Sequence, residues 1–358
     1  MSAADNRTSP SLGIVEGYFG PPWSWADRTH AMRILASHGF TRFFYAPKAD
    51  AHLRRRWDEA HSAEQAENIG AFAHACRKEN VRFGIGLTPF ELHRNWTASG
   101  RERLRRRVGQ LADLGLTDLA ILFDDMKGDV PDLAAIQADI MVEVRTTVPD
   151  LNLTMCPSYY SEDPVLDRVF GQRPNGYLAD LGHLLPADID IFWTGPEVCS
   201  RELSPGHLER IGDTFARKPV LWDNYPVNDG PRMSGHLHLR GMTGRGGIGD
   251  RIGAHYINPA LQPHLTLVPA LTLATMYRQG GDYDYLTATH EAAHTLLPAP
   301  LADALMADLL TLQDAGRARI HPGKLQDKYA AFDHPAAQEI VRFLAGDYET
   351  SAEDVQTQ

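Results

Sequence analysis

Short apolar runs alternate with longer amphipathic segments along most of this chain. Eight runs have the length and composition of strands buried on both faces, and they span residues 13–18, 42–46, 82–87, 119–123, 152–156, 189–193, 219–222 and 254–257. The segments between them repeat apolar residues with helical spacing, as at 28–38, 63–78 and 101–114. Eight strand–helix alternations predict an α/β fold of the (β/α)₈ TIM barrel type.

The chain beyond the last alternation differs from the rest. Helical patterns occur at 301–315 and 336–344, and prolines separate them. We therefore predict that a small α-helical C-terminal segment packs on the barrel. The expected parts are a flexible N-terminus (1–12), the barrel (13–290), the helical segment (291–348) and a disordered tail (349–358).

Polar residues stand at the end of nearly every predicted strand. The active sites of such barrels are built from the C-terminal ends of the strands. Residues that are far apart in the sequence are therefore expected to converge on one mouth. They are Glu16-Gly17, Lys48 with Asp50, Thr88-Pro89, Asp124-Asp125, Tyr159-Tyr160, Thr194-Gly195, Asp223-Asn224 and Asn258.

The pair Asp124-Asp125 follows the apolar run 119–123 directly. Two adjacent carboxylates repel each other and burial disfavours both charges, so one of them should bind its proton more tightly than free aspartic acid. A protonated carboxyl beside an ionised one suits acid catalysis next to a developing positive charge. An isolated Asp-Asp pair is more often a solvated turn or a helix N-cap; the other polar strand ends favour the catalytic interpretation here.

Composition and charge narrow the possible partners. With a net charge of −11 over 358 residues, the chain is a poor match for nucleic acid or an anionic membrane. Its three cysteines are widely spread, which argues against a disulfide framework and suits a reducing compartment. The first ten residues lack the apolar core of a signal peptide, and no stretch has the length of a membrane span. These features predict a cytoplasmic protein; none of them indicates an oligomeric state.

Two local patterns invite other interpretations. His236 and His238 would face the same side of a strand, as two metal ligands do, but no third ligand has a recognisable spacing and the region has the composition of a flexible loop. The glycine-rich run 244–249 lacks the preceding strand and the Lys-Ser/Thr of a phosphate-binding loop. We therefore predict neither a metal nor a cofactor.

Seven motifs, taken together and in order, resemble the glycoside hydrolase family 84 domain, which contains the O-GlcNAcases and related β-N-acetylglucosaminidases. They cover the chain from about residue 13 to 280. They are Val15-Glu-Gly-Tyr-Phe-Gly-Pro-Pro-Trp23, Tyr45-Ala-Pro-Lys-Ala-Asp50, Phe123-Asp-Asp125, Cys156-Pro-Ser-Tyr-Tyr160, Trp193-Thr-Gly-Pro-Glu-Val198, Trp222-Asp-Asn-Tyr-Pro-Val-Asn-Asp229 and Asn258-Pro259.

The resemblance implies a retaining mechanism in which the 2-acetamido oxygen of the substrate attacks the anomeric carbon. An oxazoline forms and water then opens it, an exception to the usual scheme with a carboxylate nucleophile. By the same resemblance Asp124 would polarise the acetamido N–H, and Asp125 would be the general acid and then the general base.

The resemblance also implies the substrate-binding residues. Tyr160 would donate to the acetamido oxygen, Trp222 would wall the acetamido methyl group, and Asn224 would hold the acetamide or the aspartates. The sugar hydroxyls would bind to Gly17, Lys48, Asp229 and Asn258. The segment 230–250 directly follows Asp229 and is expected to shape the leaving-group side of the site.

The function implied is that of an exo-β-N-acetylglucosaminidase that removes terminal β-linked N-acetylglucosamine from a glycoprotein or a small glycoconjugate. Two alternatives stay open. One is a catalytically silent sugar-binding protein that has kept the pocket, and the other is an endo-acting, hyaluronidase-like glycosidase, which needs an open groove. We expect no acetyltransferase-like or lectin-like domain of the kind that longer relatives carry within these residues.

Overall fold

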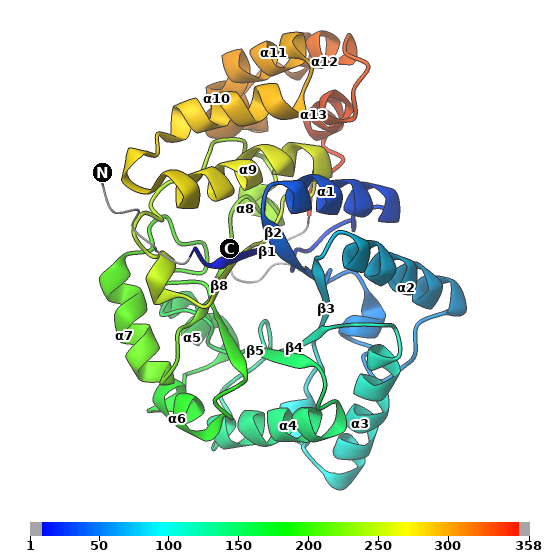
Figure 1. The fold of residues 1–358 in the computed structure, drawn as a ribbon, viewed down its shortest axis with the longest axis vertical. Coiled ribbons are helices and arrows are strands. Elements are labelled where there is room, and N and C mark those ends of the chain that lie inside the picture. Colours follow the sequence, from blue (N-terminus) through cyan, green and yellow to red (C-terminus); the bar gives the residue numbers. More distant parts are fainter. Residues whose placement is uncertain (1–8, 351–358) are drawn as a thin grey trace, which may run out of the picture.

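The computed structural model describes residues 9–350, and within them eight parallel strands close into a barrel in sequence order (Figure 1). β1 pairs with both β2 and β8, which closes the ring. The predicted (β/α)₈ barrel is therefore confirmed; β3, β5 and β8 have the expected bounds, and the ends of the other strands lie within two residues of those expected. The strands are β1 (Ser11–Glu16), β2 (Phe40–Tyr45), β3 (Arg82–Leu87), β4 (Asp118–Leu122), β5 (Asn152–Cys156), β6 (Asp190–Trp193), β7 (Val220–Asp223) and β8 (Ala254–Ile257).

Aromatic side chains from three strands fill the inside of the barrel. The rings of Phe44, Phe192 and Tyr256 lie 5.4–5.8 Å apart between centroids and are buried. A side chain at Gly84 would collide with the Phe44 ring, because a Cβ there would lie 2.3 Å from it. Large rings opposite a glycine therefore pack the barrel as a core, and the site can only form above this core, at the end of the strands.

An outer ring of helices surrounds the strands (Figure 1). Serine, threonine or aspartate side chains cap the N-termini of several of these helices; Ser24, Ser62 and Thr97 are examples. The ring consists of α1 (Trp25–Ser37), α2 (Ala63–Lys78), α3 (Ala98–Ala112), α4 (Leu133–Thr147), α5 (Pro164–Phe170), α6 (Tyr177–Leu184), α7 (Pro205–Phe215) and α9 (Pro263–Gln279).

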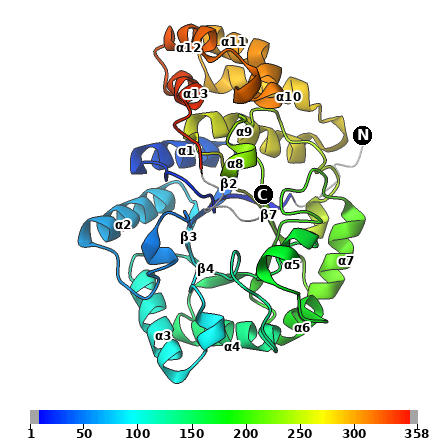
Figure 2. The ribbon, with the colours of Figure 1, turned by 180° about the vertical axis from the view of Figure 1, so that it is seen from behind.

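Four further helices stack beside α9 and α1 at one side of the barrel (Figure 2). They are α10 (Tyr285–Leu296), α11 (Ala299–Leu310), α12 (Pro322–Ala330) and α13 (Pro335–Ala345). The buried Glu339 of α13 accepts the backbone N–H groups of His264 and Leu265 at the start of α9. The helical region is thus tied to the barrel by a carboxylate at a helix N-terminus. Helix α10 spans the border that the sequence suggests at residue 290, and most of the tail expected at 349–358 lies outside the described residues.

The segment 230–250 is not the flexible loop expected from its composition. It begins with the short helix α8 (Gly230–Met233), and Leu237, Leu239 and Met242 are buried. The backbone N–H of Leu237 donates to Leu312 in the helical region. The segment contains many glycines and charged residues, but these three buried apolar side chains fix its conformation. Burial of their apolar surface is favourable, and the composition of the segment does not show which side chains are buried. No helix among the described residues is long and apolar enough to span a membrane.

Candidate active site

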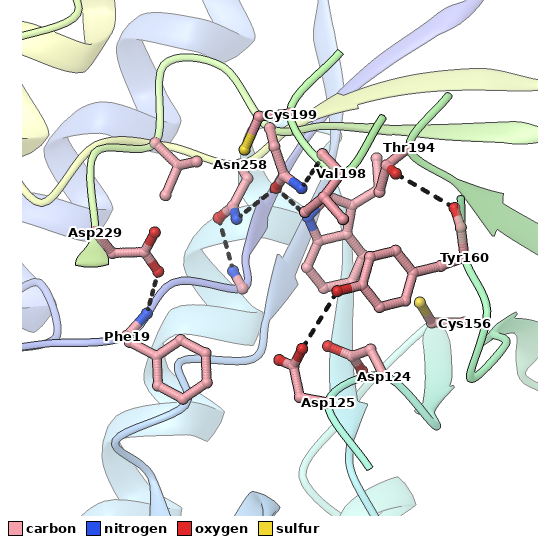
Figure 3. A pocket seen from close by; sticks show the side chains of 14 residues that line it. Phe19, Asp124, Asp125, Cys156, Tyr160, Thr194, Val198, Cys199, Asp229 and Asn258 are labelled. Carbon is pink, nitrogen blue, oxygen red and sulfur yellow. Dashed lines mark hydrogen bonds between the residues drawn. The ribbon is translucent and has the colours of Figure 1, made fainter. Parts of the chain in front are cut away.

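A pocket lies at the C-terminal ends of the strands (Figure 3), and its empty space, including the part open to solvent, is about 490 Å³. Residues from six strand ends and the loops after them form its wall. They are Gly17, Phe19, Asp124, Asp125, Cys156, Tyr160, Thr194, Val198, Cys199, Trp222, Asn224, Val227, Asp229 and Asn258. Of the nine site residues that the family resemblance implies, eight are in this wall; the ninth, Lys48, lies behind it.

Lys48 is the counter-ion of the aspartate pair. Its buried ammonium donates to Oδ2 of Asp124 in a very short contact and lies 3.6 Å from Oδ2 of Asp125. Burial opposes the charge of Lys48, but the attraction of the two aspartates raises its pKa above the ordinary value. The two carboxyl groups therefore share one cation, which can balance only one of their two negative charges.

Asp125 carries the perturbed carboxyl group. Burial, helped by the charge of Asp124, raises the pKa of Asp125, while Lys48 and Arg54 oppose the shift. The Tyr160 hydroxyl donates to Oδ1 of Asp125 over 3.3 Å. The direction of this shift for Asp125 is the one expected for one member of a buried carboxyl pair.

Asp124 presents an acceptor to the pocket. Its Oδ2 is bound to Lys48, whereas its Oδ1 is buried and has no hydrogen-bond partner among the described residues. A buried acceptor without a partner is unfavourable, so this oxygen is prepared for a donor that arrives with a ligand.

Three side chains at the ends of β7 and β8 form a hydrogen-bonded chain (Figure 3). Oδ1 of Asn224 accepts from Nε1 of Trp222 (3.1 Å) and from Nδ2 of Asn258 (3.0 Å). The Asn258 oxygen in turn accepts the backbone N–H of Gly17 at 3.0 Å. Asn224 also donates to the backbone oxygen of Val198 at 2.8 Å. The amide of Asn224 thus fixes the indole and the next asparagine, and the hydrogen bonds described for it do not include one to either aspartate.

Gly17 is required by the indole ring behind it. A Cβ at this position would lie 1.9 Å from Cζ2 of Trp222, far inside van der Waals contact. A side chain at this position would therefore collide with Trp222 itself. The glycine therefore lets Trp222 lie flat against the end of β1 as a wall of the pocket.

Asp229 closes the opposite side of the pocket. Its Oδ2 accepts the backbone N–H of Phe19 at 2.7 Å. Burial raises the pKa of Asp229 to about 6, and the charge of Asp125 contributes to the shift. This carboxylate is therefore held in place by the loop after β1 and faces the aspartate pair across the cavity.

Several wall residues were not among the predicted site residues. Phe19, Val198 and Val227 are apolar and follow strands in loops, where sequence patterns do not separate a pocket wall from ordinary packing. Thr194 was expected at the mouth as a polar strand end, and it lines the pocket while its hydroxyl donates to the backbone oxygen of Tyr160. Cys156 belongs to a quoted motif and gave no signal of its own.

Three other polar strand ends serve the scaffold rather than the pocket. Asp223 forms a buried ion pair with Arg245 (2.7 Å) and a hydrogen bond with His255 (3.0 Å). Asp50 accepts from the Tyr45 hydroxyl at 2.9 Å, and the Tyr159 hydroxyl donates to the backbone of Gly171 at 2.6 Å. Polarity at a strand end therefore marks the correct end of the barrel but not the direction in which each side chain points.

The described residues contain no group of three or more His, Cys, Asp and Glu side chains that could hold a metal ion. His236 binds the backbone oxygen of Gln313, and His238 stacks on Tyr225. The three cysteines are free. The side chains that line the pocket carry carboxyl, phenol, amide, hydroxyl and thiol groups, and the ammonium of Lys48 lies against the aspartate pair.

Comparisons with known proteins agree with this geometry. A family model described as beta-N-acetylglucosaminidase matches residues 12–309. The protein O-GlcNAcase of Mus musculus is 29% identical over 288 residues, which are 78% of this chain and 31% of that protein. That of Rattus norvegicus is 29% identical over 276 residues, 74% of this chain and 30% of that protein. The chain thus spans less than a third of the length of these curated relatives.

A solved structure of a mutant O-GlcNAc hydrolase from Thermobaculum terrenum superposes with a TM-score of 0.77 at 25% identity, and the match covers 94% of this chain and 74% of that one. The same barrel and helical region are therefore found in a protein of this type. Since the family model covers most of the chain, the resemblance is confirmed: this chain belongs to the β-N-acetylglucosaminidase family, glycoside hydrolase family 84.

Proposed function

We propose that this chain is a retaining exo-β-N-acetylglucosaminidase that removes terminal β-linked N-acetylglucosamine by substrate-assisted catalysis. One observation carries the proposal. A buried aspartate pair at the end of β4 shares the cation Lys48, and it combines a carboxyl of raised pKa with a carboxylate oxygen that lacks a partner. A pocket wall of indole and phenol beside this pair suits an acetamido group.

In the first step Asp124 orients the nucleophile. Its free Oδ1 accepts the acetamido N–H, which increases the electron density on the acetamido oxygen. That oxygen attacks the anomeric carbon, and the bond to the leaving oxygen breaks. The positive charge of the oxazoline that forms lies beside Asp124, whose carboxylate stabilises it while Lys48 holds its other oxygen.

Asp125 moves the proton in both steps. As the glycosidic bond breaks, its carboxyl gives a proton to the leaving oxygen, which departs as an alcohol. The carboxylate then takes a proton from the water that opens the oxazoline, and Asp125 returns to its starting state. The raised pKa of Asp125 suits this cycle, because it keeps the group protonated closer to neutral pH.

The remaining wall residues hold the sugar. Tyr160 lies within hydrogen-bond distance of Asp125, and we assign its hydroxyl to the acetamido oxygen when the substrate binds. Trp222 lies against the acetamido methyl group and is positioned by Asn224. Asp229 and Asn258 are assigned to the hydroxyls of the sugar ring, as is the backbone at Gly17.

The proposed substrate is a glycoprotein or small glycoconjugate that carries terminal β-linked N-acetylglucosamine. The relatives named protein O-GlcNAcase support the protein-linked form. Cytoplasmic action is part of the proposal and rests on the three unpaired cysteines.

Substrate selectivity at the 2-position tests the proposal. Aryl β-N-acetylglucosaminides should be hydrolysed and the matching β-glucosides should be slower by several orders of magnitude, because an oriented intramolecular group contributes roughly 7–11 kcal/mol. Progressive fluorination of the acetyl group should slow the reaction stepwise, and a thiazoline analogue of the oxazoline should inhibit competitively. Equal rates for acetyl and fluoroacetyl substrates, together with no inhibition by the thiazoline, would refute neighbouring-group participation. An absence of any turnover would favour a silent sugar-binding protein.

A further inference from the structure

Arg54 contacts the proposed general acid but has no part in the mechanism above. It follows the short 3₁₀ helix η1 (Ala51–Leu53) in the loop after β2. Its guanidinium donates to the backbone oxygen of Asp125 over 3.3 Å. Its Nε is buried and has no hydrogen-bond partner among the described residues. A partly buried arginine is thus directed at the backbone of Asp125 rather than at solvent.

Two aromatic rings fix the guanidinium of Arg54. Its centre lies 5.6 Å from the ring of Phe19, in the loop after β1, and 5.2 Å from the ring of Phe90, in the loop after β3. Cations are attracted to ring faces at such distances. Phe19 also lines the pocket. The guanidinium therefore joins three loops at the mouth of the barrel and reaches the end of β4.

The backbone of Asp125 needs such support. Its φ angle is 57°, in the left-handed region that side chains other than glycine seldom adopt. Aspartate tolerates this region better than most residues, yet it persists only where the surroundings hold it. The conformation turns the chain sharply after Asp124, so that two successive aspartates both face the pocket. A hydrogen bond to the carbonyl of Asp125 fixes the peptide plane on which this turn depends.

We propose that Arg54 is a positioning residue for acid catalysis: held between Phe19 and Phe90, it fixes the backbone of Asp125 so that the carboxyl points at the leaving oxygen. The inference rests on the proposed function, because it takes Asp125 to be the general acid.

The positive charge of Arg54 also affects the pKa of the Asp125 carboxyl group. Four other titratable residues also face Asp125, namely Lys48, Asp124, Tyr160 and Asp229. Burial and Asp124 raise the pKa of Asp125, and the two cations Lys48 and Arg54 limit the rise. Without Arg54 the pKa of Asp125 should rise further, while the carboxyl loses its fixed direction. A purely structural arginine would produce neither effect.

Three variants separate these roles. Arg54→Met removes the charge and the hydrogen bond but keeps much of the bulk, and Arg54→Lys keeps the charge without the planar guanidinium. Arg55→Met is the matched control, because Arg55 is exposed and also lies near the Phe90 ring, at 5.9 Å. Each is assayed with aryl β-N-acetylglucosaminides from an acidic to a weakly acidic phenol, and with the methyl glycoside. Thermal melting confirms that each variant is folded.

In Arg54→Met, kcat/KM should fall about tenfold or more for the methyl glycoside and less than about threefold for the most acidic phenol, since only poor leaving groups depend on the acid. The alkaline limb of its kcat/KM profile, which reports the proton of Asp125, should move to higher pH. Arg54→Lys should show the leaving-group dependence with a smaller shift of the limb. Arg55→Met should match the wild type in both.

Equal losses across the leaving-group series with an unmoved alkaline limb would overturn the inference and leave Arg54 a structural role. Wild-type protein that hydrolyses no β-N-acetylglucosaminide would instead refute the proposed function, so the two failures are distinguishable.

Discussion

At the scale of single residues, the two aspartates have different surroundings, so a substitution at each should lower the activity in a different way. Asp125 has a raised pKa and a phenol neighbour, which suits proton transfer to the leaving oxygen. Asp125→Asn should lower kcat by roughly 10²–10⁴-fold for poor leaving groups, the usual scale of acid–base catalysis, and much less for an acidic phenol. A leaving-group series measured at constant pH checks this. Losses that do not depend on the phenol would remove Asp125 from the acid role.

Substitution of Asp124 should slow all substrates whatever their leaving group, because every substrate must form the oxazoline. Asp124→Asn would place an amide beside Lys48 and offer a weaker acceptor to the acetamido N–H. We expect large losses of kcat for good and poor leaving groups alike. Added azide should not restore the rate with an inverted product. Recovery of an α-glycosyl azide would mark Asp124 as a direct nucleophile and would contradict substrate assistance.

At the scale of elements, the ends of β1 and β7 depend on each other through the Gly17–Trp222 contact. Gly17→Ala would place a methyl group 1.9 Å from Cζ2 of the indole, so the ring must move and the Trp222–Asn224 hydrogen bond must break. KM for N-acetylglucosaminides should rise and kcat should fall. Gly70→Ala on α2, where the added methyl meets nothing within 4 Å, is the control and should leave both unchanged.

The segment 230–250 contributes to the site through Arg245. Its guanidinium binds both oxygens of Asp223 at 2.7–2.9 Å and also the backbone oxygens of Ser200, Arg201 and Thr243. It therefore joins β7 to the loop after β6, which forms the Val198 wall. Arg245→Met would leave Asp223 buried and unpaired with its main cation, which should cost about 3–5 kcal/mol of unfolding free energy. Denaturant unfolding measures this, and a loss below about 1 kcal/mol would mean that the pair is not stabilising.

At the scale of the whole molecule, Glu339 ties the helical region to the barrel through His264. Burial opposes protonation of His264, but the hydrogen bond and the charge of Glu339 raise its pKa. The nearby His30 has a lowered pKa because burial and His264 disfavour its charge. With its folded pKa above the unfolded value, His264 stabilises the fold fully below the unfolded pKa, and this contribution is lost as the pH rises through the folded pKa.

Glu339→Gln should therefore destabilise the protein by about 1.5–3 kcal/mol below the unfolded pKa of His264, the scale of a hydrogen bond to a charged group. The difference from the wild type should shrink as the pH rises above the folded pKa. Unfolding free energies measured across this range test the linkage. A difference that does not change with pH would show that Glu339 acts only as a cap of α9.

Sequence patterns predicted the barrel because a strand that is buried on both faces is a continuous apolar run. Each such run can be recognised without knowing its neighbours. They also predicted the mouth, since a polar residue directly after an apolar run must lie at a strand end. Asp124, Asp125, Tyr160 and Asn258 all line the pocket for this reason. The motifs of the family then implied roles that strand periodicity does not contain.

Tertiary structure alone decided which groups touch. Lys48 and Asp124 are 76 positions apart, Gly17 and Asn258 are 241 apart, and closure of the barrel brings each pair together. Asp223, another polar strand end, turns to Arg245 instead of the pocket. The segment 230–250 was misjudged because three buried apolar side chains outweigh its polar composition. A periodic pattern reports how each residue is buried, whereas a hydrogen-bond partner depends on the register of strands that are distant in the sequence.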